Sequence, residues 1–423
     1  MTARKTVLIL GADGFIGRHI AFHFRACGWR VLAHARNTAK LKAMGFDTLE
    51  ADLFKPESLT AEFWQSKLET VTHLVNAAGV LSAPHPVYEA VHVIAPNHIY
   101  KALPAGTKGV LVSAVGIQTA DTDFARYRRA GEGVARENGL NILRAGLVLA
   151  DTSYGGSSLA RALAVLPFRT PVVGDGQQQF NPIHASDLAA MVEHTLSQPT
   201  NPEPRDVGGP ETLTQAEVLQ GLRAWLGLKP QPVLRLPIRL ARALGWIGDK
   251  MHLGPISAQA VAQLEHGVVA KSDSPLPTNP RGFSQFVNAR PAGTQDIWHA
   301  RLYLARPALR LTLAFLWLAS GLLGLLLPSN TFLPMLGHTG LPDGFLIALA
   351  RLGGLFDIAL AAALLRGYRP RLTALAQLAL VGGYTFVFSA LSPALWLLPL
   401  GGLLKNIPIL ALIAVTLILE EER

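Results

Sequence analysis

Three glycines near the start of the chain have the spacing that a phosphate-binding turn requires. An apolar run, Val7–Leu10, leads into Gly11, Gly14 and Gly17, and an amphipathic segment follows. In a strand, turn and helix of this kind the first glycine permits a tight turn and the second admits a pyrophosphate close to the backbone. The third lets the helix pack on the strand. Because the phosphates then meet free N–H groups at the positive end of the helix, the stretch predicts a dinucleotide site.

The second expected strand, at 29–34, bears on which dinucleotide is bound. It ends at Arg36, and no acidic residue stands where a carboxylate would hold an adenosine ribose. An arginine there can bind a ribose phosphate through a bidentate, charge-assisted contact, which favours NADP, with NAD as the alternative. The alternative is that Arg36 is a solvated surface residue with no role in binding. At the end of the next short strand, Asp52 and Leu53 are placed to contact the adenine.

Two further strand ends carry small or hydroxyl side chains. The expected strand at 71–76 closes in the turn Ala77, Ala78 and Gly79, which would pass beside the cofactor, and the strand at 109–113 ends at Ser113. Ser113 has two equal interpretations, a substrate contact and a hydroxyl that caps the next turn. Alternating strands and helices of this length predict a doubly wound parallel α/β sheet of the Rossmann type, covered on both faces.

These motifs in this order resemble the extended or atypical branch of the short-chain dehydrogenase/reductase superfamily. In that family a Tyr-x-x-x-Lys pair follows the serine and moves the proton. Aligned on the following Ala-Gly-Glu, the tyrosine position holds Phe124 and the lysine position holds Arg128. The other register places Tyr127 in the tyrosine position but leaves Gly131 where the amine should be. Since a phenyl ring has no ionisable proton, the usual relay is in doubt.

The resemblance assigns a set of site residues. The catalytic candidates are Ser113, Tyr127 and Arg128, and no metal site is predicted. The cofactor candidates are Gly11, Asp13, Gly14, Phe15, Ile16, Gly17, Arg36, Asp52, Leu53, Ala77, Ala78, Gly79, Ser113 and Arg128. A later stretch, Ile183-His-Ala-Ser-Asp187-Leu, resembles a family signature on the substrate side. His184 and Asp187 are more often a helix cap there than a catalytic pair.

Composition divides the 423 residues into a polar, periodic part and an apolar tail. We expect an NAD(P)-binding domain at 1–270, with a small α/β substrate lobe over about 150–270, then a linker at 271–300 that includes Pro275, Pro277, Pro280 and Pro291, and a membrane domain at 301–423. The net charge of +9 does not gather on an aromatic-laced patch, so we expect no nucleic-acid partner. The single Cys27 cannot form an internal disulfide, which fits a reducing cytosol.

Four apolar runs in the tail, at about 309–327, 345–365, 372–391 and 394–419, are each near the ~20 residues that cross a bilayer. Arginines precede the first run and join the second to the third, and the other two loops carry none. The positive-inside rule therefore predicts a multi-pass protein of the inner (cytoplasmic) membrane, with the first domain and the C-terminus in the cytoplasm. The fourth run resembles the last helix of DoxX-like proteins.

Charges inside these runs are costly unless they are paired or line a cavity. We expect Arg351 to meet partners on other helices and Asp357 to pair with Lys405; Gln377 also lies within a run. A purely structural role for these residues and a role in binding a quinone or lipid headgroup are equally open.

Taken together, the sequence predicts a membrane-anchored oxidoreductase-like protein that acts on or senses a hydrophobic substrate such as a quinone, sterol or lipid. A membrane protein or a second copy of the chain is an expected partner besides the lipid bilayer. One alternative is a non-catalytic assembly or redox-sensing module, like the complex I accessory subunit that the first domain resembles. A weaker alternative is a sugar-nucleotide epimerase or dehydratase, against which the missing proton relay argues.

Overall fold

The structure is a computed structural model that describes residues 5–251, 256–271, 278–336, 340–391, 393–398 and 402–420. The chain forms two units, one of residues 1–245 and 257–297 and the other of residues 246–256 and 298–423. Each unit is described by itself below.

A seven-stranded parallel sheet is the centre of the first unit, with strand order β11-β6-β5-β4-β1-β2-β3. Its strands are β1 Thr6–Leu10, β2 Arg30–Ala35, β3 Asp47–Glu50, β4 His73–Asn76, β5 Lys108–Ala114, β6 Asn141–Ala145 and β11 Arg205–Val207. The first six follow the 3-2-1-4-5-6 order of a dinucleotide-binding sheet, in which ligands bind at the carboxyl ends near the point where the order reverses. The predicted doubly wound sheet is confirmed.

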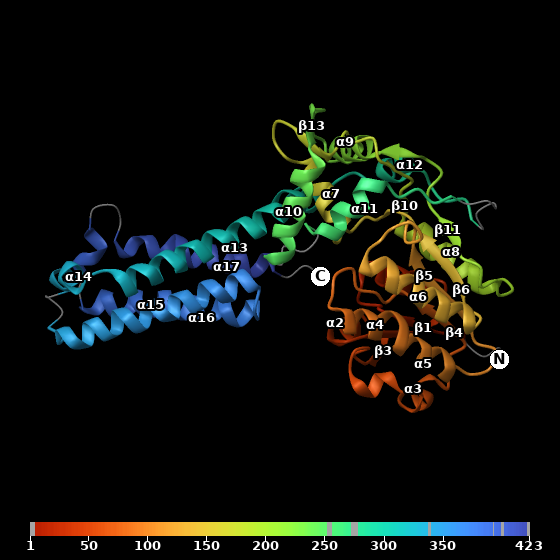
Figure 1. The fold of residues 1–423 in the computed structure, drawn as a ribbon, viewed down its shortest axis with the longest axis horizontal. Helices are drawn as coiled ribbons and strands as arrows, with labels where there is room; N and C mark the ends of the chain where they lie inside the picture. The colour runs from red at the N-terminus through yellow and green to blue at the C-terminus, as the bar shows by residue number, and fades with distance from the viewer. Residues whose placement is uncertain are drawn as a thin grey trace. The chain divides into compact units, whose positions relative to one another are not determined.

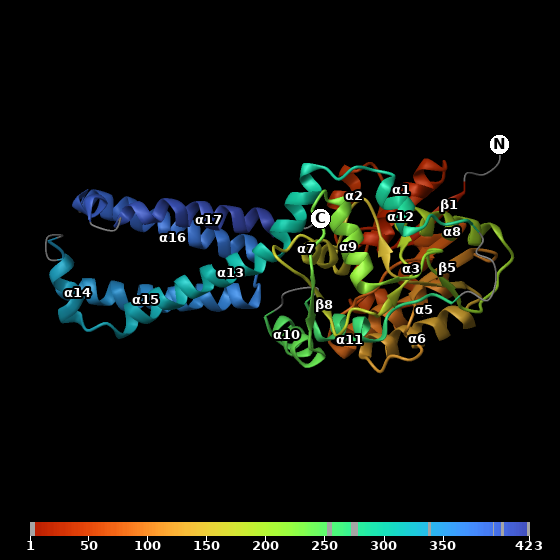
Figure 2. The ribbon, with the colours of Figure 1, turned by 90° about the horizontal axis from the view of Figure 1, so that it is seen from above.

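Helices cover both faces of this sheet because β1 is apolar on both sides. Val7 and Ile9 pack with residues of α1 and α8, whereas Leu8 and Leu10 pack with residues of α3 and α5. Figure 2 shows α1 and α8 on one side of the strands and α5 and α6 on the other. The helices of this layer are α1 Phe15–Ala26, α2 Ala39–Ala43, α3 Ala61–Leu68, α4 His85–Glu89, α5 Ala95–Ala102, α6 Asp123–Glu137 and α8 Ala185–Ser197.

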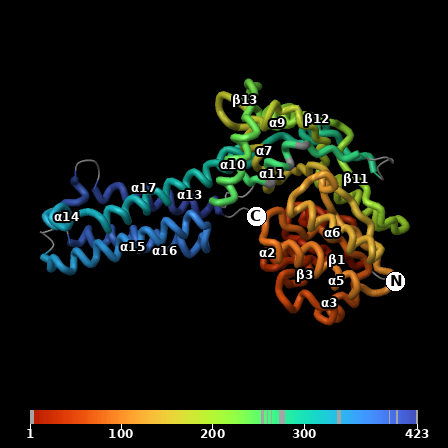
Figure 3. Tube along the Cα trace, in the orientation of Figure 1, coloured from red at the N-terminus to blue at the C-terminus, as the bar shows by residue number. Residues whose placement is uncertain are grey.

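After β6 the chain builds a small second lobe of short strands and helices (Figure 3). It contains β7 Val148–Leu149, α7 Gly156–Ala164, β8 Thr170–Val173, β9 Gln179–Phe180, β10 Ile183–His184, β12 Leu213–Thr214, α9 Gln215–Trp225, β13 Val233–Leu236, α10 Ile238–Lys250, α11 Ala258–His266 and α12 Phe283–Asn288. The stretch at 271–300, which the sequence predicts to be a linker, contains the helix α12 and contributes to the core of the lobe. Phe283 and Phe286 of α12 are buried in the lobe's core, and residues 272–277, with Pro275 and Pro277, lie outside the described residues.

The second unit is helical throughout its described residues, with helices that run alongside one another (Figure 1). They are α13 Thr294–Leu326, which begins in the first unit, α14 Ser329–Leu336, α15 Asp343–Arg366, α16 Pro370–Leu391 and α17 Asn406–Leu419. Three of them, α13, α15 and α16, are long and apolar enough to cross a membrane. Gly321 and Gly324 let α13 approach α15 closely, since a Cβ at Gly321 would lie 2.7 Å from the carbonyl oxygen of Gly354.

The fourth predicted span, at 394–419, is not one continuous helix. A 3₁₀ turn at Pro393–Leu397 and a second at Leu403–Lys405 precede α17, which has 14 residues. Pro393 and the unusual backbone at Gly402, with φ 14° and ψ −119°, break the helical pattern. A helix of this length is shorter than the ~20 residues that span a bilayer.

Candidate nucleotide-binding and active site

The glycine turn between β1 and α1 brings two backbone segments into contact. Gly11 has φ +72°, and a Cβ there would lie 2.8 Å from the Cα of Ala78. A Cβ at Gly17 would lie 2.1 Å from the carbonyl oxygen of Gly11. Helix α1 begins at Phe15 after Gly14, and its first turn has no side-chain cap. In the described part of the chain no side chain caps its N-terminal N–H groups, which is the arrangement that can bind an anion.

The turn at 77–79 is held by the last residue of β4. The Asn76 side chain accepts a hydrogen bond from the Ala78 N–H at 3.0 Å and donates one to the Tyr100 hydroxyl at 2.6 Å. Burial raises the pKa of Tyr100 to about 12, so the phenol stays protonated. Sequence reasoning did not find Tyr100, because its partner lies 24 residues away on a different element.

Arg128 of α6 lies at this same sheet edge. Its buried guanidinium donates to the carbonyl oxygens of Ala78, at 3.1 Å, and of Val112 on β5, and contacts His92 Nδ1 at 3.1 Å. Burial lowers the pKa of Arg128, and burial together with the charge of Arg128 lowers the pKa of His92 to about 3. His92 is thus neutral and accepts from the arginine. A Cβ at Gly79 would lie 3.5 Å from the guanidinium, which places Arg128 beside the predicted cofactor turn.

The contacts of α6 favour the register that leaves no tyrosine and no lysine. A Cβ at Gly131 would lie 2.5 Å from the His92 carbonyl oxygen, so the alternative register has no room for a lysine there. The Tyr127 ring stacks on Tyr88 with centroids 5.5 Å apart, and its hydroxyl lies 3.5 Å from His85 Nδ1. Among the described residues no hydrogen bond or ring contact joins Tyr127 to Ser113 or to the glycine turn. Phe124 packs edge-on against His92.

Ser113, near the end of β5, is buried, and its hydroxyl has no hydrogen-bond partner among the described residues. The turn-capping interpretation of this serine is therefore not seen. Since a buried hydroxyl without a partner costs about 1–3 kcal/mol, a ligand group that bonds to it would recover that free energy. The residue remains a candidate for a substrate contact.

The other side of the glycine turn carries a buried histidine. His34 of β2 accepts from the Gly11 N–H through Nδ1 at 3.4 Å, and burial lowers its pKa to about 4. The neutral ring thus supports the glycine turn. Arg36 is exposed directly after β2, without a side-chain hydrogen bond in the described part of the chain, and Asp52 and Leu53 follow β3. These groups fit a dinucleotide. Gly11 and Gly17 let the backbone segments approach closely at the turn, and the N-terminus of α1 has no side-chain cap.

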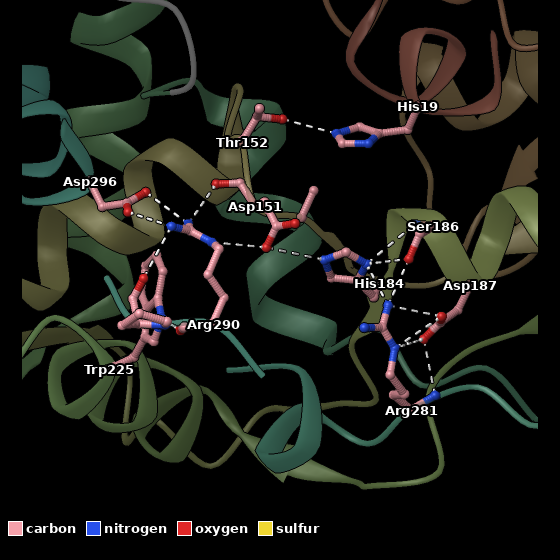
Figure 4. Close-up of polar contacts among 12 residues, drawn as sticks. His19, Asp151, Thr152, His184, Ser186, Asp187, Trp225, Arg281, Arg290 and Asp296 are labelled. Atoms are coloured by element: carbon pink, nitrogen blue, oxygen red, sulfur yellow. Dashed lines mark hydrogen bonds and ion pairs between the residues drawn. The ribbon is translucent and has the colours of Figure 1, made fainter. Parts of the chain in front are cut away.

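His184 and Asp187 have the structural role that the sequence favoured. The His184 side chain caps α8 by accepting from the Ser186 N–H at 3.3 Å, and Asp187 binds Arg281 through both the backbone N–H and the guanidinium (Figure 4). Burial, and then the charge of Arg281, lower the pKa of His184. An N-terminal cap of this kind contributes about 1 kcal/mol.

Next to this cap the lobe has a small hollow, lined among others by Asp151, Arg161, His184, Trp225 and Arg290. Arg290 bonds to Asp151 at 3.1 Å and to Asp296 at 2.9 Å (Figure 4). The guanidinium groups of Arg290 and Arg161 both lie over the Trp225 ring. The loop that lines the hollow is attached to α1 by a 2.9 Å contact between Thr152 and His19. Both carboxylates that face Arg290 are thus paired with it, and sequence reasoning missed this cluster because its members come from four separate segments.

Arg351, Asp357 and Gln377 form hydrogen bonds in the second unit, but not all of their partners are the expected ones. Arg351 donates to the carbonyl oxygens of Gly324 and Leu327 at 2.8 Å each, which are partners at the end of α13, as predicted. The predicted pair of Asp357 and Lys405 is wrong: Asp357 accepts from Ser320 at 2.6 Å, and Lys405 is exposed. Because the chain breaks around Gly402, Lys405 lies in a short 3₁₀ turn rather than within a membrane helix.

The buried glutamine of α16 completes this set. Gln377 accepts from the Trp317 indole N–H at 2.8 Å and donates to the carbonyl oxygen of Thr373 at 3.2 Å. Both ends of its amide are therefore satisfied within the helices.

Comparison with known proteins agrees with this architecture. Residues 7–108 match the NAD dependent epimerase/dehydratase family, and residues 314–414 match the DoxX-like family. The first part of the chain is thus similar to NAD(P)-binding domains of the epimerase/dehydratase type. The chain joins such a domain to a DoxX-like domain with candidate membrane spans.

Two curated relatives match parts of the chain. Divinyl chlorophyllide a 8-vinyl-reductase of Zea mays is 26% identical over 274 residues, which is 58% of this chain and 65% of that protein. A short-chain dehydrogenase/reductase of Pestalotiopsis microspora is 36% identical over 83 residues, 19% of this chain and 30% of that one. The chain thus spans less than two thirds of the length of either relative.

Among solved structures, the dTDP-glucose 4,6-dehydratase of Streptomyces venezuelae with NAD bound superposes with a TM-score of 0.50. It is 16% identical, and the match covers 67% of this chain and 96% of the dehydratase. At this identity the similarity concerns the fold.

Proposed function

We propose that the protein is a membrane-anchored, NAD(P)H-dependent reductase of a hydrophobic substrate such as a quinone, sterol or lipid. The observation that carries the proposal is the carboxyl edge of the sheet. There the turn before the uncapped α1 closely approaches the 77–79 turn, and Ser113, near the end of β5, has no hydrogen-bond partner for its hydroxyl among the described residues. This edge belongs to a chain with three candidate membrane spans, which would keep the domain at a bilayer.

The residues divide the work as follows. A nicotinamide, when bound, supplies hydride to the substrate. The α1 N-terminus would hold the pyrophosphate, and Ser113 would donate a hydrogen bond to a polar group of the substrate. Phe124 has no ionisable proton, and the Tyr127 hydroxyl lies next to His85. The proton that completes the reduction would therefore come from solvent.

The reaction and the character of the substrate are supported from two sides. The maize relative is named a divinyl chlorophyllide a 8-vinyl-reductase, which supports a reductase activity for the part of this chain that resembles it. The helical unit supplies a route to substrates that partition into lipid. We infer a location in the inner membrane, with the first unit and the C-terminus in the cytoplasm. The arginines that join α15 to α16, Arg366, Arg369 and Arg371, favour the cytoplasmic side for that loop. The 2.9 Å ion pair between Arg306 and Glu420 keeps the end of α17 beside the cytoplasmic start of α13, although α17 is too short to span the bilayer by itself.

Turnover by the purified full-length protein in detergent tests the reductase proposal. NADPH or NADH oxidation is followed with a panel of quinones, and we expect oxidation with at least one of them. Ser113→Ala should lower kcat/KM roughly 10-fold or more, the effect of losing one hydrogen bond to the reacting substrate. Thr119→Ala, an exposed hydroxyl after the same strand, is the control and should leave the rate unchanged. Nucleotide binding without oxidation would contradict the proposal.

The non-catalytic alternative has a specific observation in its favour. Both terminal nitrogens of Arg128 are bonded within the protein, so the residue that replaces the family's lysine is already used to hold the sheet edge. A nucleotide would then stabilise the fold and support assembly or redox sensing. In that case NADPH should raise the Tm of the detergent-solubilised protein while no substrate class is reduced.

In both proposals the choice between NADP and NAD depends on Arg36. We propose NADP, because Arg36 is exposed at the end of β2 without an ion pair among the described residues. Arg36→Asp should weaken NADPH binding by roughly 10–100-fold and leave NADH binding within a few-fold. Arg30→Asp, at the opposite end of the strand, is the matched control. Equal losses for both nucleotides would remove the phosphate assignment.

A further inference from the structure

Three metal-binding side chains from two helices lie together away from the nucleotide edge. His23 and Cys27 are four residues apart near the end of α1, and Glu193 of α8 is 170 residues from His23. One ligand atom of each lies within 4.8 Å of the other two. Helical i, i+4 spacing puts His23 and Cys27 on one face, which is a common way to present two metal ligands.

The distances are close to those of a tetrahedral zinc site. Zinc–ligand bond lengths imply about 3.6 Å between a bound sulfur and a bound nitrogen, and about 3.3 Å between a nitrogen and an oxygen. Cys27 Sγ lies 3.7 Å from His23 Nε2, and His23 Nε2 lies 2.8 Å from Glu193 Oε2. The first pair already has the required separation. The second needs to open by about half an ångström, which partly exposed side chains can do by small rotations.

The surroundings favour a cation. The Trp29 indole N–H donates to Glu193 Oε1 at 2.8 Å, which fixes the carboxylate and leaves Oε2 directed at the histidine. Such outer hydrogen bonds orient metal ligands in known sites. A thiolate and a carboxylate together balance a divalent ion, and Cys27 is exposed while His23 and Glu193 are 22% and 28% exposed, so an ion can enter.

We propose that His23, Cys27 and Glu193 bind a divalent transition metal of the zinc type, with water or another small molecule as the fourth ligand. N, S and O donors suit Zn²⁺ and not the harder Mg²⁺. The ion would join the end of α1, whose other end faces the nucleotide, to α8. It displaces the thiol proton on binding. Sequence reasoning predicted no metal because the third ligand comes from a distant helix.

Cys27 is the only cysteine in the chain, so its alkylation reports on this site alone. The full-length protein in detergent is treated with iodoacetamide after chelation, with added Zn²⁺ and with added Mg²⁺. We expect Zn²⁺ to slow alkylation at least about 10-fold and Mg²⁺ to have no effect. EDTA should restore the original rate. Unchanged alkylation in Zn²⁺ would overturn the proposal.

Variants show whether the two other ligands take part. His23→Gln and Glu193→Gln should each reduce the protection by Zn²⁺ several-fold, whereas His194→Gln, the next residue on α8, should retain it. Full protection in both ligand variants would mean that the thiol binds zinc alone, which contradicts the site. A second measurement uses Co²⁺, whose bond to a thiolate absorbs in the near ultraviolet. That band should appear in the wild type and be absent in Cys27→Ser; no band in the wild type would also sink the proposal.

Discussion

Arg128 in the first unit and Arg351 in the second are both bonded to backbone carbonyl oxygens rather than to carboxylates among the described residues. The positions of those carbonyls differ. Arg128 joins the turn after β4 to β5, across the edge of a parallel sheet, whereas Arg351 bonds to the last carbonyls of α13. A helix leaves its final carbonyls without partners, and a cation there is favourable.

This difference shows which unit is prepared for a ligand. At the sheet edge, among the described residues, the Ser113 hydroxyl has no hydrogen-bond partner and the first turn of α1 has no side-chain cap. In the helical unit, Arg351 donates to carbonyl oxygens at the end of α13. The Trp317 indole donates to the Gln377 side chain, so these two polar groups are also paired within the unit. The buried polar groups of the helical unit mainly hold helices together, although one Asp357 oxygen has no hydrogen-bond partner among the described residues. Nucleotide chemistry therefore belongs to the first unit.

The largest effect is expected at the glycine turn. Gly11→Ala should lower the free energy of unfolding by roughly 2–5 kcal/mol, because the added Cβ meets the Ala78 backbone and the φ of +72° is unfavourable for alanine. Nucleotide binding should be lost as well. Gly139→Ala is the control: it has φ +69° but open space around its Cβ, and should cost only about 1–2 kcal/mol. Denaturant unfolding and NADPH titration measure both, and equal losses would contradict the close approach.

Local spacing predicted the glycine turn, the 77–79 turn and a doubly wound parallel sheet, because each motif reports on its own backbone. The partners that hold those turns were not predicted, since His34, His92 and Tyr100 act on residues far along the chain. The register of α6 was left open by the sequence and is favoured by the tight contact at Gly131. In the helical unit, hydropathy found the three long helices, but it does not report the break near Gly402 that separates Lys405 from Asp357.

Replacing Arg128 tests the sheet edge. Arg128→Met should cost roughly 2–4 kcal/mol, because the carbonyls of Ala78 and Val112 lose their donor in a buried place. NADPH affinity should fall with it. Arg126→Met, on the exposed side of the same helix, should change stability by less than about 1 kcal/mol. Thermal unfolding with and without NADPH measures both quantities. A stable Arg128→Met that binds nucleotide normally would show that the arginine is dispensable at this edge.

Acid should destabilise the first unit, because His34 is buried neutral with its pKa lowered to about 4. Between pH 6.5 and 4, His34 is protonated in the unfolded chain but neutral in the folded chain, so the free energy of unfolding falls as the pH is lowered. At pH 5 this one group should cost about 2 kcal/mol relative to pH 8. His92, with its pKa near 3, adds in the same direction. The Tm of wild type and His34→Gln is compared from pH 8 to 5; the same pH dependence in both would contradict the role of His34.

The smallest effect is expected at Arg351. Arg351→Met should lower stability by about 1–2 kcal/mol, since hydrogen bonds within helical membrane proteins are worth less than the full cost of an orphaned group. The end of α13 should loosen, because the Gly324 and Leu327 carbonyls lose their donor. Arg366→Met, exposed at the end of α15, is the matched control and should be near neutral. NADPH affinity should stay at the wild-type value in both variants, because Arg351 completes a helix and does not serve the nucleotide edge. Weaker nucleotide binding in Arg351→Met but not in Arg366→Met would instead show that the two units are coupled, and the division of roles between the two arginines would fail.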